Sequence, residues 1–160
     1  MTEAGAARDD GPVHDGLTGL PNGTYFREAL DIEVARAHAE HAPLTLAYFD
    51  IDDFRGINDR SGHDVGDRVL SEVARRLREA AGSVGIVARD HGDHFGLILP
   101  GLTVEAAKRI AAGLRASLDE NPLEEVGLVS FRARAAELGP ADSPRDLWWR
   151  ATLLRGGHDF

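Results

Sequence analysis

The sequence predicts one mixed β-sheet with helices packed against it. Two observations indicate this fold class. Apolar residues recur at helical spacing in several segments, and short runs rich in apolar and β-branched residues lie between them. The predicted order is helix, strand, helix, helix, hairpin, helix, strand, helix, and a sheet covered by helices is the natural packing for that order.

Composition and charge limit what the protein can do. With 42% hydrophobic and 28% charged residues over 160 positions, the chain is typical of a single globular domain. The net charge of -9 disfavours binding of a DNA or RNA polymer, and every apolar run is too short to span a bilayer. The absence of cysteine excludes disulfides. We expect a cytoplasmic protein with no membrane association.

The first half of the chain is predicted to hold three helices and one buried strand. Residues 1–13 are small and polar and are expected to form a disordered tail, so that the domain comprises residues 14–160. In chain order the elements are a helix over 25–41, a strand over 44–49, and helices over 52–60 and 65–81. The apolar faces of the two long helices are formed by Phe26, Leu30, Val34 and Ala37, and by Val69, Leu70, Val73, Ala74 and Leu77.

The second half begins with a predicted hairpin. Strands over 84–89 and 95–99 flank residues 90–94, with Gly92 expected at a turn position of positive φ. A helix over 104–118 follows Thr103 as its cap, with an inner face made of Ala107, Ile110, Ala111 and Leu114. A strand is predicted over 126–134. The last helix is predicted over 143–154, with Ser143 as its N-cap and Pro144 at its first position.

Polar residues that could carry chemistry lie at three places. Asp50 ends a buried strand, where its carboxylate could coordinate a hard cation; alternatively, Asp52 or Asp53 merely caps the next helix. Asp93 lies at the hairpin tip, and an acid there beside a strand-end acid would give the two-carboxylate site that two-metal phosphoryl chemistry requires.

The third place joins the two central helices. Asn58 and Asp67 could offer an amide and a carboxylate to a purine edge. The alternative is structural: Asn58-Asp59 ends one helix and Asp64 caps the next. The residues by themselves leave both alternatives open.

These segments, taken together, resemble the GGDEF (diguanylate cyclase) domain. The resemblance is carried, in the family's order and spacing, by Asp15-Gly-Leu-Thr-Gly-Leu-Pro-Asn22, Phe49-Asp-Ile-Asp-Asp-Phe54, Ile57-Asn-Asp59, Gly62-His-Asp-Val-Gly-Asp67 and the Arg-x-x-Gly-Asp-x-Phe hairpin. It covers nearly the whole chain from His14 onward. It implies an α+β cyclase-palm fold with a ferredoxin-like core, in which a mostly antiparallel central sheet is flanked by helices.

The resemblance also implies a ligand and its contacts. Two such domains face each other in the family, each with one GTP and Mg²⁺ or Mn²⁺, and condense the two GTP molecules to cyclic di-GMP and pyrophosphate. By match, the metal ligands would be Asp50, the Ile51 carbonyl and Asp93. The nucleotide would be contacted by Asn58, His63, Asp67, Phe54 and Gly92.

The signature itself departs from the family. It reads His91-Gly92-Asp93-His94-Phe95, so the first glycine and the fourth-position glutamate are both histidines. His91 adds a side chain where the backbone would approach phosphate, and His94 cannot supply the negative charge of the glutamate. As a neutral imidazole, His94 could still act as a base or bind a softer metal.

Further departures lie on either side of the signature. The strand that usually reads Ser-Ile-Gly-Val is Ser130-Phe-Arg-Ala133, and Arg155 is the one candidate for the two phosphate-holding cations of the family's last helix. The product-inhibition motif Arg-x-x-Asp would fall at Gly82-Ser-Val-Gly85 and is absent.

We therefore predict a degenerate, catalytically inactive GGDEF domain that binds GTP or docks onto a protein partner in cyclic di-GMP signalling. The alternative is an active diguanylate cyclase that works as a homodimer, with Asp93 in the catalytic site. A rival metal site would join His91, Asp93 and His94 with His63 or Asp50. Trp148 and Trp149 are adjacent on one helix, so one of them is expected to be exposed and to mark a partner surface.

Overall fold

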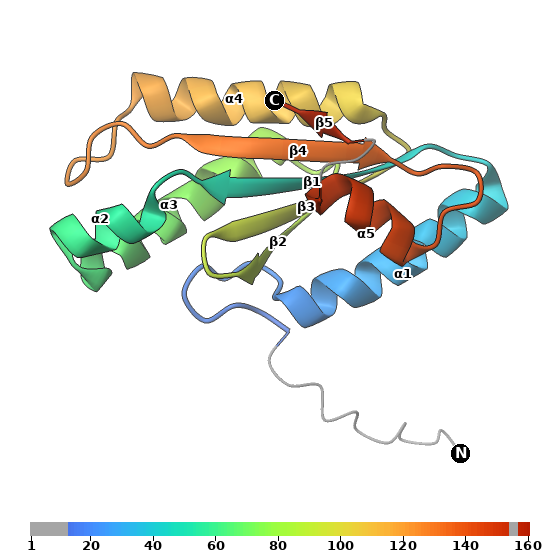
Figure 1. The fold of residues 1–160 in the computed structure, drawn as a ribbon, viewed down its shortest axis with the longest axis horizontal. Helices are drawn as coiled ribbons and strands as arrows, with labels where there is room; N and C mark the ends of the chain where they lie inside the picture. The colour runs from blue at the N-terminus through green and yellow to red at the C-terminus, as the bar shows by residue number, and fades with distance from the viewer. Residues whose placement is uncertain (1–12, 154–156) are drawn as a thin grey trace, which may run out of the picture.

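The computed structural model describes residues 13–153 and 157–160 (Figure 1). The tail predicted over 1–13 lies outside the described residues except for Val13, and so does Arg155. The elements in chain order are α1 Gly23–Glu40, β1 Leu44–Ile51, α2 Phe54–Ser61, α3 His63–Ala81, β2 Ile86–His91, β3 His94–Pro100, α4 Val104–Glu120, β4 Phe131–Glu137, α5 Pro144–Thr152 and β5 His158–Asp159. None of the described helices is long and apolar enough to cross a membrane.

The strands form one sheet in the order β2-β3-β1-β4-β5, and every neighbouring pair is antiparallel. The prediction of a mixed sheet from the order of elements was wrong. An apolar run indicates a strand, but it does not indicate whether the neighbouring strand runs parallel or antiparallel. The α+β fold with an antiparallel central sheet, which the resemblance implied, is confirmed.

Helices cover both faces of this sheet (Figure 1). On one face α3 and α4 pack over the sheet in the larger apolar cluster, which includes Phe49, Phe95 and Leu97. On the opposite face α1 and α5 pack over Leu46 and Ile98. Alternate residues of β1 therefore enter different clusters, and Tyr48 and Asp50 lie on the α1–α5 face.

The helices of the first half match their predicted faces. The predicted inner residues of α1 and α3 are all buried. The helix predicted over 52–60 begins only at Phe54, because β1 continues to Ile51. Gly62 ends α2 and precedes α3 at φ 90°, a conformation that favours glycine, so the two helices meet at a sharp corner.

The last predicted strand was misplaced. Residues 126–130 are not a strand, because Gly127 turns at φ 76° and its amide bonds back to the Leu123 carbonyl. Pairing with β1 starts at Phe131 and continues to Glu137. The C-terminal strand β5 was not predicted at all.

Thr103 and Ser143 were both predicted to cap a helix, and only Ser143 makes a capping bond. Thr103 occupies the N-cap of α4 without a capping side-chain bond, and the Glu137 carboxylate accepts the Val104 amide at 2.7 Å instead. Ser143 caps α5 as predicted, in a reciprocal capping box with Asp146, although this helix ends at Thr152 rather than at residue 154.

Candidate functional site

The signature hairpin is tighter than predicted. β2 extends to His91 and β3 begins at His94, so only Gly92 and Asp93 form the turn. Gly92 has a φ of 53°, as predicted for this position. The Ile51 amide donates to the Asp93 carbonyl at 3.4 Å, which fixes the hairpin tip against the end of β1.

Arg89 makes a second set of contacts that fixes the hairpin tip. Arg89 donates through Nε to the Gly92 carbonyl at 2.9 Å and through a terminal nitrogen to the Asp15 carboxylate at 3.2 Å. Asp15 also accepts from the amide and hydroxyl of Thr18, each at 2.8 Å. The turn-rich segment that begins at Asp15 thus supports the hairpin, although it contributes no group to the cavity described below.

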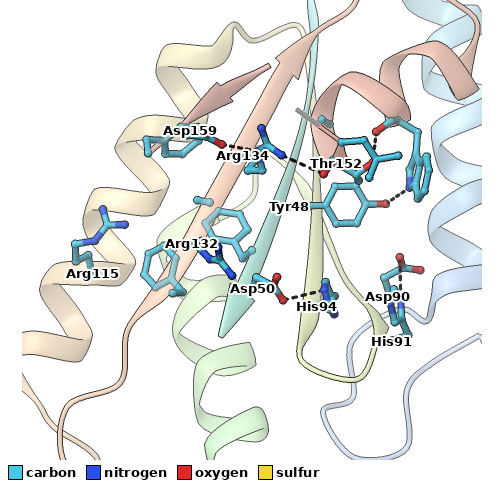
Figure 2. Close-up of a pocket in the computed structure, with 17 residues that line it drawn as sticks. Tyr48, Asp50, Asp90, His91, His94, Arg115, Arg132, Arg134, Thr152 and Asp159 are labelled. Atoms are coloured by element: carbon cyan, nitrogen blue, oxygen red, sulfur yellow. Dashed lines mark hydrogen bonds and ion pairs between the residues drawn. The ribbon is translucent and has the colours of Figure 1, made fainter. Parts of the chain in front are cut away.

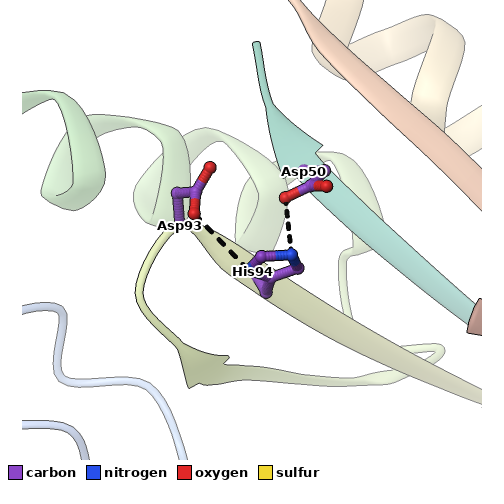
Figure 3. A group of neighbouring side chains, drawn as sticks. All are labelled: Asp50, Asp93 and His94. Atoms are coloured by element: carbon purple, nitrogen blue, oxygen red, sulfur yellow. Dashed lines mark ion pairs between the residues drawn. The ribbon is translucent and has the colours of Figure 1, made fainter. Parts of the chain in front are cut away.

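The two acids that the sequence singled out converge at this corner. Asp50 at the end of β1, Asp93 at the hairpin tip and His94 at the start of β3 bring one ligand atom each within 4.8 Å of one another. Figure 3 shows the His94 imidazole between the two carboxylates. His94 Nε2 lies 2.9 Å from Asp50 Oδ1, and His94 Nδ1 lies 3.4 Å from Asp93 Oδ1.

Neither contact is a hydrogen bond, because Asp50 Oδ1 and His94 Nδ1 are buried atoms that have no hydrogen-bond partner. Burial raises the pKa of the Asp50 carboxyl; His94 opposes this shift and the Asp93 carboxylate adds to it. Two acids and an imidazole with unfilled bonding capacity can share a proton or a divalent cation.

The donor set fits a divalent cation. Carboxylate oxygens are ligands for Mg²⁺ and Mn²⁺, whereas an imidazole nitrogen favours softer transition metals such as Zn²⁺. Among the described residues, the predicted rival cluster is reduced to Asp50, Asp93 and His94. His91 stacks on His94 with ring centres 4.6 Å apart, but its Nδ1 lies 3.2 Å from Asp90.

The predicted base-reading residues lie at the α2–α3 corner. The Asn58 side chain lies against Gly66, and its buried Oδ1 has no hydrogen-bond partner. Phe54 is partly buried beside it, while His63 and Asp67 are exposed on the first turns of α3. The exposed His63 and Asp67 side chains are able to contact a ligand, whereas Asn58 Oδ1 is buried against Gly66.

The structural alternatives for this region are only partly realised. Asp53 stands at the N-cap of α2 but makes no capping bond, and its carboxylate pairs with Arg60 at 3.0 Å. The Asn58 carbonyl accepts a hydrogen bond from the Gly62 amide at the end of α2. The backbone of Asn58 therefore ends the helix, and its side chain takes no part in that contact. Asp64 lies in the first turn of α3, although Gly62 occupies the cap position.

A cavity of about 820 Å³ opens beside the hairpin and is lined by strand residues, by α5 and by Arg115 of α4 (Figure 2). Asp50, His91 and His94 line one end, and β4, α5 and the C-terminal residues line the rest. Asn58, His63 and Asp67 do not line it. Sequence reasoning missed Arg132 and Arg134, whose side chains enter the cavity; their alternation along a strand was the available signal.

Comparison with known proteins agrees with this geometry. The sequence model of the family described as "Diguanylate cyclase, GGDEF domain" matches residues 12–128. The chain is 41% identical over 113 residues to diguanylate cyclase DgcP of Pseudomonas aeruginosa, covering 71% of this chain and 17% of that protein. It is 35% identical over 145 residues to response regulator PleD of Caulobacter vibrioides, covering 87% of this chain and 32% of PleD.

A solved structure is similar over most of the fold. The GGDEF domain of DgcB from Caulobacter crescentus, in complex with c-di-GMP, matches with a TM-score of 0.84 at 30% identity, over 88% of this chain and 86% of that one.

The antiparallel sheet and its acidic hairpin corner define a cyclase-type α+β domain. Within that class, the chain belongs to the GGDEF diguanylate cyclase family. It spans about a sixth and a third of the lengths of DgcP and PleD, respectively.

Proposed function

We propose that this domain binds GTP in a cyclic di-GMP signalling protein without converting it to cyclic di-GMP. One observation carries the proposal. The His94 imidazole, which stands where the family has a glutamate, lies between the Asp50 and Asp93 carboxylates and contacts both. The corner that would hold the metal cation during phosphoryl transfer therefore has one carboxylate fewer than the family signature provides.

The charge balance explains the expected loss of turnover. Attack of one GTP 3′-hydroxyl on the α-phosphorus of another needs cations that stabilise the negative charge developing on the phosphate oxygens, and carboxylates hold those cations in place. A neutral His94 contributes no negative charge, and a protonated His94 would neutralise the acids beside it. Losing one such contact typically lowers the rate about a hundredfold to a thousandfold.

Asp50, Asp93 and the Ile51 carbonyl remain as oxygen ligands for Mg²⁺ or Mn²⁺. A cation held there would supply electrostatic stabilisation of the phosphate oxygens. Asn58 and Asp67 are proposed to read the guanine edge, with His63 and Phe54 beside them and the Gly92 backbone close to phosphate. The exposure of His63 and Asp67 at this corner supports this assignment.

The first experiment measures turnover. Purified protein is mixed with GTP and Mg²⁺ or Mn²⁺, and pyrophosphate and cyclic di-GMP are assayed. We expect no product from the unchanged protein, and product from the double variant His91→Gly, His94→Glu, which restores the signature. Product from the unchanged protein that disappears in Asp93→Ala would instead establish the alternative, an active homodimeric cyclase.

The second experiment measures binding by calorimetry and by the shift in melting temperature. GTP is expected to bind and to raise Tm, and Asp67→Ala is expected to weaken binding because a carboxylate accepts two guanine donors. If millimolar GTP gives neither heat nor a Tm shift, the domain acts by docking a protein partner. Trp149 on α5, 42% exposed, marks a surface for such a partner.

A further inference from the structure

Arg132 lines the cavity and has few hydrogen-bond or ion-pair partners within the described part of the protein. Its side chain is 82% exposed, and its one ionic partner among the described residues is Asp52, 3.6 Å from Nε. It donates no hydrogen bond in the described part of the chain, so both terminal nitrogens are available to a ligand.

The sheet register places Arg132 beside the acidic corner. Arg132 on β4 is the direct cross-strand partner of Asp50 on β1, and Arg134 is the partner of Tyr48. Directly opposed residues of an antiparallel pair project to the same face of the sheet. Figure 2 shows Arg132 next to Asp50, and Arg134 farther along β4 beside Thr152 of α5.

The other charges of the cavity are already engaged. Arg134, whose side chain is 18% exposed, donates to the Thr152 carbonyl at 3.2 Å and pairs with Asp159. Asp90 pairs with Arg27 at 3.1 Å. Arg115 lies 4.6 Å over the Phe131 ring. Among the described arginines of the lining, only Arg132 makes neither a hydrogen bond nor a ring contact; its one ion pair is with Asp52.

We infer that Arg132 binds a phosphate group of an anionic ligand in this cavity. The inference rests on the proposed GTP binding and names the residue that would hold the phosphate chain. A guanidinium presents a planar pair of donors that matches two phosphate oxygens, which makes arginine suited to this contact. A cavity of about 820 Å³ accommodates a chain of several phosphate groups.

Arg132 also lies where it can reduce the repulsion between a bound phosphate and the carboxylates of the hairpin corner. A phosphate chain at the hairpin tip approaches Asp50 and Asp93, and like charges in a partly buried site repel strongly. Arg132 lies directly across from Asp50 in the strand register, so its positive charge lowers that repulsion. Arg134 acts as a positioning residue, because it ties β5 and the end of α5 to the wall of the cavity.

The test compares three ligands by calorimetry: GTP, inorganic triphosphate and guanosine. Arg132→Gln is the variant, Arg132→Lys keeps the charge without the planar fork, and Arg109→Gln is the matched control on the exposed face of α4. We expect Arg132→Gln to weaken GTP and triphosphate binding roughly tenfold to a hundredfold, the usual range for a charged hydrogen bond. Arg132→Lys should recover part of the loss, and Arg109→Gln should bind as the unchanged protein does.

The outcomes separate this inference from the proposed function. If GTP binds and Arg132→Gln binds it equally well, the role of Arg132 is overturned while GTP binding stands. If triphosphate binds through Arg132 but GTP binds no better than triphosphate, the phosphate site stands and guanine recognition fails. If neither ligand binds, both are overturned. The Tm of each variant confirms folding, which an exposed side chain is not expected to disturb.

Discussion

Asp15 acts at a distance on the hairpin tip. It lies 74 residues before Arg89 in the chain, yet its carboxylate pairs with that guanidinium, which in turn holds the Gly92 carbonyl. Burial tends to raise the pKa of Asp15, but the hydrogen bonds from Thr18 and the pairing with Arg89 outweigh it, so the pKa is lowered. The charged carboxylate thus stabilises the folded state.

We predict that Asp15→Asn lowers the free energy of unfolding by about 1–3 kcal/mol at pH 7, because charged hydrogen bonds are lost. Since the folded-state pKa is depressed, the contribution of Asp15 is present above its unfolded value near 3.9 and is lost as the pH falls through the folded value. Denaturant unfolding at pH 7 and pH 3 measures this. The variant should lose less stability on acidification than the unchanged protein does.

Asp31→Asn is the control for this prediction, because Asp31 is an exposed acid on α1. It should leave stability at pH 7 nearly unchanged. An equal loss in the two variants would argue against a specific role of the Asp15–Arg89 contact.

At the scale of elements, buried Arg76 joins α3 to the end of α4. Its Nε donates to Glu72 at 2.8 Å, and one terminal nitrogen donates to the carbonyls of Ser117 and Asn121. The Ser117 carbonyl already accepts the Asn121 amide at 3.0 Å, so Arg76 adds a second bond there, and it supplies a donor to the carbonyl of the C-cap residue Asn121. Bonds from Arg75 and Arg76 lower the pKa of Glu72 to about 2, which keeps the pair ionised.

Glycines decide how closely two helices approach. A Cβ atom at Gly66 would lie 1.7 Å from Asn58 Oδ1, whereas one at Gly113 would make an ordinary contact of 3.7 Å with Ala80. We predict that Gly66→Ala costs about 1–3 kcal/mol through overpacking. It should also weaken GTP binding, because the Asn58 amide must move.

Gly113→Ala is the matched control on α4. It should stabilise the protein by about 0.5–1 kcal/mol, since glycine is unfavourable inside a helix. Thermal unfolding and GTP titration of both variants test the pair. If Gly66→Ala binds GTP as tightly as Gly113→Ala does, the α2–α3 corner is not the base-reading site.

At the scale of the whole molecule, the C-terminal residues protect an edge of the sheet. The backbone of Phe160 exchanges two bonds with Ala133, at 2.9 and 3.1 Å, and β5 pairs with β4 at Arg134 and Ala135. Without these residues β4 would present unpaired amides and carbonyls, which promote association between chains.

We therefore predict that deletion of residues 158–160 lowers Tm and increases self-association. Calorimetry and light scattering over a range of protein concentrations measure the two effects. Asp159→Asn is the control, because it weakens the ion pair with Arg134 but keeps the backbone bonds. It should lower Tm less and leave association unchanged; equal association of the two variants would contradict edge protection.

Local patterns predicted the helices well. The apolar faces of α1, α3 and α4 and the capping box region of α5 depend on residues three or four apart, so the sequence contains the whole signal. The strand predicted over 126–134 failed because its apolar run begins in a turn, and β4 is defined by pairing with β1 rather than by composition. The predicted convergence of Asp50 and Asp93 is borne out by the geometry, whereas their metal-binding role stays a prediction.

The sequence by itself determined the family, the helices and the pair of acids, because motifs and periodicities are local properties of the chain. Only the tertiary structure decided that the sheet is antiparallel throughout, that His94 lies between the acids, and that Arg132 faces Asp50. Each of these depends on the register between strands far apart in sequence. Register is fixed by packing of whole faces, and no short segment encodes it.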